Sequence, residues 1–62
     1  MVKEKPVRYV EAMKLIELIR ERLASIEKAL REEAYIDAES EALIAYDLFK
    51  SLKITIRRLE RL

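Results

Sequence analysis

The sequence predicts an all-α fold, an antiparallel two-helix hairpin that homodimerises into a four-helix bundle. Two apolar stripes, each with residues at alternating spacings of three and four, are typical of amphipathic helices that pack along a seam. The stripes do not share a phase, so one straight helix would turn its apolar face around at mid-chain. Pro6 is the only proline and glycine is absent. We therefore predict a single domain over residues 1–62, with helices at about 6–33 and 38–61 and a turn at about 34–37.

The first helix is predicted to begin at Pro6, because the first helical position has no intrahelical use for its N–H. The apolar stripe that follows comprises Tyr9, Ala12, Ile16, Ile19, Leu23, Ile26 and Leu30.

The second helix is predicted to begin after Asp37, whose side-chain oxygen can cap the first backbone N–H groups. Its stripe comprises Tyr35, Ala38, Ala42, Ala45, Phe49, Leu52, Ile56 and Leu59. The turn between the helices contains no glycine to adopt a left-handed backbone conformation.

Dimerisation is predicted from the size of the chain and from the width of its apolar faces. A chain of about 60 residues is only marginally stable alone, and the absence of cysteine excludes a disulfide. Apolar residues beside the two stripes widen each face to what a bundle requires. The predicted dimer interface comprises Leu15, Leu18, Ile44, Leu48 and Leu62.

Charge predicts how two hairpins are oriented. Acidic residues dominate positions 32–47, at the predicted turn, whereas Lys and Arg gather near both chain termini. Packing with the turns at opposite ends brings each acidic turn to the partner's basic termini.

A basic face on the second helix is the candidate site for a further partner. It comprises Leu43, Tyr46, Lys50, Lys53, Ile54, Arg57 and Arg61. Like charges four residues apart mildly destabilise a helix, so a face chosen only for stability would have acidic residues interspersed there. Basic residues beside aromatic and aliphatic ones suit the binding of an acidic protein or of nucleic acid. The alternative is a solvated face that compensates the dipole at the helix C-terminus.

Enzymatic chemistry is not expected. Histidine and cysteine are absent, which removes the side chains that most often act as bases, nucleophiles or transition-metal ligands. The carboxylates near the turn match no calcium loop, and a ferritin-like site requires histidine. We predict no catalytic residue, no cofactor and no metal.

Two resemblances accompany this pattern. Chain length and the hairpin resemble the Rop-type dimeric bundle, an RNA-binding plasmid regulator, although no residue motif transfers. The stretch Ala34 to Ala38 resembles small archaeal HEPN-type helical proteins. Their nuclease pattern contains a histidine, so the resemblance implies no nuclease activity here.

We predict a non-enzymatic adaptor that binds another protein, with a nucleic-acid-binding regulatory dimer as the alternative. The lack of Asn, Gln and Cys and the abundance of Glu, Lys and Arg favour a natural thermophilic archaeal or bacterial protein over a designed one. No stretch is apolar enough to span a membrane and no signal-peptide core is visible, so we expect a cytoplasmic location.

Overall fold

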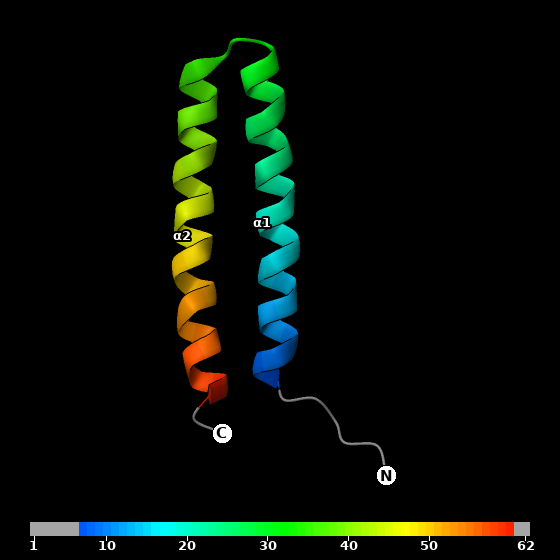
Figure 1. The fold of residues 1–62 in the computed structure, drawn as a ribbon, viewed down its shortest axis with the longest axis vertical. Helices are drawn as coiled ribbons and strands as arrows, with labels where there is room; N and C mark the ends of the chain where they lie inside the picture. Colours follow the sequence, from blue (N-terminus) through cyan, green and yellow to red (C-terminus); the bar gives the residue numbers. More distant parts are fainter. Residues whose placement is uncertain (1–6, 61–62) are drawn as a thin grey trace.

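The structure, a computed structural model, describes residues 7–60 as two helices, α1 (Val7–Arg31) and α2 (Tyr35–Glu60). The helices lie side by side and run in opposite directions, joined by a tight turn (Figure 1). The predicted all-helical hairpin is therefore confirmed. The predicted helix start at Pro6 and the last residue of the second predicted helix, Arg61, lie outside the described residues.

The turn lies earlier than predicted, at residues 32–34, and it ends α1 with a Schellman motif. Glu33 N–H donates to the Leu30 carbonyl at 3.1 Å, and Ala34 N–H donates to the Ala29 carbonyl at 2.8 Å. Glu33 supplies the left-handed conformation of this motif, with φ 58°, at a position where glycine is usual. A glutamate thus takes the place of the missing glycine.

Helix α2 begins at Tyr35 rather than after Asp37. Ala34 is its N-cap, because the Ala34 carbonyl accepts the first helical hydrogen bond, from Ala38 N–H at 2.9 Å. Asp37 lies in the first turn, so its prediction as the N-cap was wrong. Its carboxylate is still placed favourably near the positive end of the helix dipole.

The most deeply buried residues of the seam between the helices are mainly small. The buried side chains of the described chain are Ala12, Ile19, Ala29, Ala38 and Ala45. Half-buried residues extend the seam at heptad spacing, among them Leu15, Arg22 and Ile26 on α1, and Glu41, Leu48, Leu52, Thr55 and Leu59 on α2.

An ion pair across the seam marks its register. The Arg22 guanidinium donates to the Glu41 carboxylate at 2.9 Å, with the two side chains 42% and 28% exposed. Stepping three or four residues outward along both antiparallel helices then places Ile19 opposite Ala45. The same stepping places Ala12 opposite Leu52, so a large residue on one helix repeatedly meets an alanine on the other.

The seam differs from the predicted stripes. Leu23, Leu30, Phe49 and Ile56, predicted inside, are between 45% and 52% exposed, and Tyr35 is 63% exposed. Charged Arg22 and Glu41 and half-buried Leu48 occupy the contact positions instead. Both helices are thus rotated relative to the prediction, and each packs through the edge of its apolar arc that lies away from these exposed residues.

Candidate binding faces

Five large exposed apolar residues lie on one side of the hairpin: Leu23, Leu30, Tyr35, Phe49 and Ile56. Leu23 and Leu30 are seven residues apart on α1, on the flank of the seam marked by half-buried Tyr9 and Ile16. The matching flank of α2 carries Ala42, Phe49 and their neighbours at the same spacing. In an antiparallel pair of helices these two flanks lie on the same side. We call this surface the apolar face; it comprises Tyr9, Ile16, Leu23, Leu30, Tyr35, Ala42, Phe49 and Ile56.

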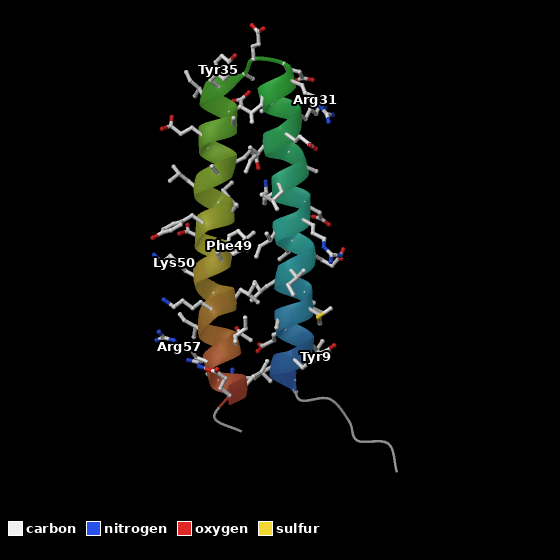
Figure 2. All side chains as sticks on the ribbon, viewed as in Figure 1. Tyr9, Arg31, Tyr35, Phe49, Lys50 and Arg57 are labelled. Atoms are coloured by element: carbon white, nitrogen blue, oxygen red, sulfur yellow. The ribbon has the colours of Figure 1, made fainter. Side chains whose placement is uncertain are left out.

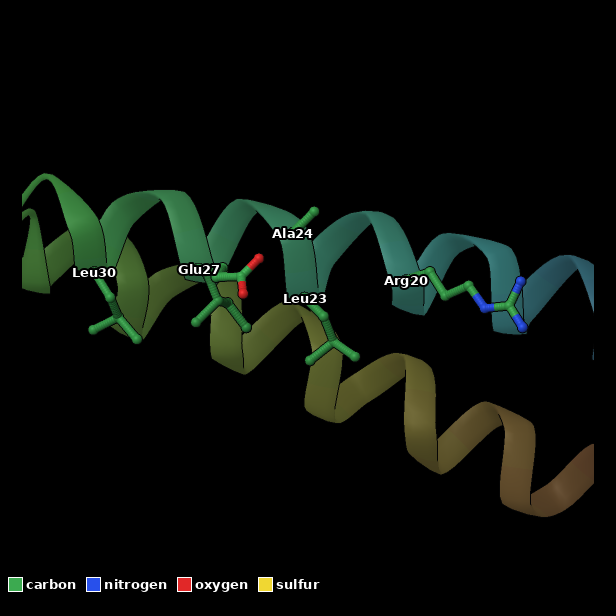
Figure 3. A pocket seen from close by; sticks show the side chains of 6 residues that line it. Arg20, Leu23, Ala24, Glu27 and Leu30 are labelled. Atoms are coloured by element: carbon green, nitrogen blue, oxygen red, sulfur yellow. The ribbon is translucent and has the colours of Figure 1, made fainter.

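Two shallow hollows lie along the apolar face, one on each helix. Leu23 and Leu30 point to the same side of α1 and line the first hollow with Ile26 (Figure 3). Phe49 and Ile56 line the second hollow, beside Leu52. Charged residues border both hollows, with Arg20 and Glu27 on α1, and Lys53 and Arg57 on α2. The apolar face is therefore a ridged surface with a charged rim.

The opposite side of the hairpin is more polar. Ser25, Glu32, Asp37 and Ser40 line a hollow there. Two exposed apolar residues, Leu18 (45%) and Ile44 (40%), lie on this side near mid-length. We call it the polar face.

The five residues predicted for the dimer interface do not form one surface. Leu18 and Ile44 lie on the polar face, whereas Leu15 and Leu48 are half-buried in the seam of the hairpin. Leu62 lies outside the described residues. Sequence reasoning assigned the residues of the apolar face to the interior, because they are alternate members of the two predicted stripes.

The basic face of α2 is a continuous exposed surface. Lys50 and Arg57 project from α2 on the side away from α1 (Figure 2). Lys50, Lys53, Ile54 and Arg57 line a common hollow, and the Lys50 ammonium lies 5.3 Å from the centre of the Tyr46 ring. Leu43 is 64% exposed on the same face. Arg61, also predicted here, lies outside the described residues.

Cation–π contact and like charge act in opposite directions on this face. The ring of Tyr46 attracts the Lys50 ammonium, which is worth about 0.5–1 kcal/mol at an exposed site. Lys53 and Arg57, one turn apart on α2, repel each other by a few tenths of a kcal/mol. Neither effect arranges a reactive group, and the face offers cations and apolar side chains for binding.

The carboxylates of the turn region do not converge. Within residues 7–60, no group of three or more Asp or Glu side chains is arranged to hold a metal ion. Glu41 is engaged with Arg22, and Glu27 lies 3.6 Å from Arg31. In the same part of the chain, neither helix has the length of apolar sequence that would cross a membrane.

Comparison with known proteins gives no external guide. No family model matches this chain, and searches of curated proteins and of solved structures found no significant similarity.

Proposed function

We propose that the chain is a non-enzymatic protein interaction module, a hairpin that pairs with a second copy into a four-helix bundle and binds another protein through the basic face. The observation that carries this proposal is the apolar face, where five large side chains on one side of a two-helix molecule remain about half exposed. Contiguous apolar surface of this kind marks interaction sites in soluble proteins.

Burial of the apolar face supplies stability that the hairpin lacks. Fully burying a Leu, Ile or Phe side chain is worth about 1.5–3 kcal/mol, so covering the exposed half of each contributes about 1 kcal/mol. Every contact occurs twice in a two-fold symmetric dimer. Within the seam of one hairpin, four of the five buried side chains are alanines, and larger residues such as Leu15, Ile26 and Leu52 remain only half-buried.

The mixture of residues on the basic face favours a protein partner. Leu43, Tyr46 and Ile54 lie among the cations, and aromatic and aliphatic side chains beside positive charge suit an acidic protein surface. Nucleic acid is the second candidate, supported by Lys50, Lys53 and Arg57 around one hollow. The net charge of +1 over the whole chain gives little general attraction to phosphate.

The dimer is tested by sedimentation equilibrium at micromolar concentration. The expected mass is about twice the 7.4 kDa of one chain. A monomer that keeps its helicity would overturn the proposed bundle.

The partner class is tested with a charge-matched pair of triple variants. Lys50, Lys53 and Arg57 are changed to Gln in one variant, and Lys14, Lys28 and Arg31 of α1 in the control, so each loses three positive charges. A photo-crosslinking residue at position 46 should capture a host protein in the control background and lose it in the first variant. Binding to generic duplex RNA with a steep salt dependence, abolished in the first variant alone, would instead establish nucleic acid as the ligand.

The thermophilic source inferred from composition stays a prediction. It would be supported if the dimer melts above about 90 °C, the usual mark of a hyperstable protein.

A further inference from the structure

We propose that a second copy of this chain covers the apolar face end for end, which means that the turns of the two chains lie at opposite ends of the bundle. Each α2 then lies antiparallel to the partner's α2, about a two-fold axis beside Tyr46. This inference rests on the proposed dimer and specifies its face, its orientation and its register. Three observations carry it: the size of the side chains along α2, the position of the matching residues on α1, and the charges on the rim.

Side-chain size is complementary along α2. Ala42 and Phe49 are equally distant from a point between Ala45 and Tyr46 in the sequence, and so are Tyr35 and Ile56. An antiparallel pairing about this point places Phe49 against the partner's Ala42, twice by symmetry. The exposed phenyl ring of Phe49 thus meets the smallest residue of the apolar face.

The same rotation aligns α1. The register marked by the Arg22–Glu41 pair places the midpoint between Ile16 and Leu23 at nearly the same level as that between Ala42 and Phe49. Leu23 then packs against the partner's Ile16, and Leu30 packs against the partner's Tyr9. One two-fold axis therefore covers both rows of the apolar face.

Rim charges select the end-for-end orientation. Glu39 and Lys53 lie seven residues on either side of Tyr46, so an antiparallel pairing of α2 places Lys53 beside the partner's Glu39, twice. With the turns together, α2 would instead lie on the partner's α1, and Glu39 would approach the partner's Glu27, a like charge on the rim of the first hollow. Exposed like charges at close range disfavour that arrangement.

One like-charge contact remains in the preferred orientation. Arg20 lies near the two-fold axis on the α1 side and approaches the partner's Arg20. In each chain the Glu17 carboxylate, 3.0 Å from the Arg20 guanidinium of the same chain, offsets this repulsion. Both arginines are also largely solvated, with 71% of the side chain exposed in the single hairpin.

The choice of face is tested with two leucines on α1 that differ in little besides the side on which they lie. Leu23 is 49% exposed on the apolar face, and Leu18 is 45% exposed on the polar face. Leu23→Glu should raise the dimer Kd by at least about 100-fold in sedimentation equilibrium, because each dimer then buries two glutamate side chains in place of two leucines. Leu18→Glu should change the Kd less than about fivefold.

The opposite result, dissociation by Leu18→Glu and tolerance of Leu23→Glu, would overturn this choice of face and leave the proposed dimer standing. A monomeric wild-type chain would overturn both. If Leu23→Glu also loses its helicity while Leu18→Glu keeps it, the result supports the apolar face, since the hairpin then depends on that contact to fold.

Orientation is tested with a charge exchange. Glu39→Lys and Lys53→Glu should each weaken the dimer by about fivefold, and the double variant should restore the wild-type Kd, because it re-forms the pair across the interface. With the turns together, Glu39→Lys would tighten the dimer by removing its repulsion from Glu27. Tightening by this single variant would therefore overturn the proposal.

A distance measurement gives an independent answer. The chain contains no cysteine, so Glu33→Cys allows one spin label per chain, in the turn. End-for-end packing separates the two labels by about 40 Å, roughly the length of α2 at 1.5 Å per residue. A separation below about 20 Å would show that the turns lie together and would overturn the proposal.

Discussion

Replacing Glu33 with glycine should stabilise the protein by about 0.5–1 kcal/mol per chain. Glu33 has φ 58° in the Schellman motif that ends α1, and a left-handed conformation costs a residue with a Cβ about 1–2 kcal/mol. Glycine removes this cost but adds about 0.4–1 kcal/mol of chain entropy to the unfolded state. The difference favours the variant, and the two hydrogen bonds of the motif, from the N–H groups of residues 33 and 34 to the Leu30 and Ala29 carbonyls, are retained.

Urea unfolding at fixed protein concentration, followed by circular dichroism, measures this difference through the transition midpoint. Glu32→Gly is the matched control, because it removes the same charge from the same turn at a residue without positive φ. It should destabilise the chain by about 0.5–1 kcal/mol. Equal destabilisation by the two variants would show that Glu33 carries no backbone strain in solution and would refute the Schellman assignment.

Two further predictions concern the seam and the start of α2. Arg22→Met should cost about 1 kcal/mol because it leaves the Glu41 carboxylate, 28% exposed in the seam, without its cation. Glu41→Leu should cost less, since the more exposed Arg22 can reach water. Combining the two substitutions should be neutral or stabilising, and a double-mutant cycle in urea checks the order. Ala34→Ser should stabilise the chain by about 0.5–1 kcal/mol, because a serine hydroxyl at this N-cap can accept a hydrogen bond from the Asp37 N–H. Thermal melting against Ala34→Val, which has no side-chain acceptor, checks this effect, and an equal shift for both variants would contradict it.

The helices and their antiparallel packing could be predicted from the sequence because both depend on patterns within each segment. Periodicity located α1 and α2 to within a few residues, and the phase break required a turn. The position of the turn was predicted wrongly, because Asp37 was taken as the N-cap of the second helix and no glycine marks the end of the first. A glutamate at positive φ leaves no such marker in the sequence.

The seam could not be predicted from apolar residues alone. Each helix carries an apolar arc wide enough for two overlapping repeats, and periodicity does not say which repeat faces the other helix. The repeat of α2 that faces α1 includes Glu41, which a search for apolar side chains does not find. Glu41 lies in the seam because it pairs with Arg22 on the other helix. The basic face was easier to locate, because Lys50, Lys53 and Arg57 needed only to remain outside the seam.

The alanines of the seam affect the steady-state level of this protein in a cell. Alanines let two helices approach closely but remove little apolar surface from water, so a hairpin with Ala12, Ala29, Ala38 and Ala45 as most of its buried side chains has little stability to lose. In the proposed bundle, folding and association become one concentration-dependent step. Chains synthesised below the dissociation constant would spend much of their time unfolded and open to proteases. The supply of folded bundle would then rise more steeply than the supply of chain, and scarce copies would be cleared before they met a partner.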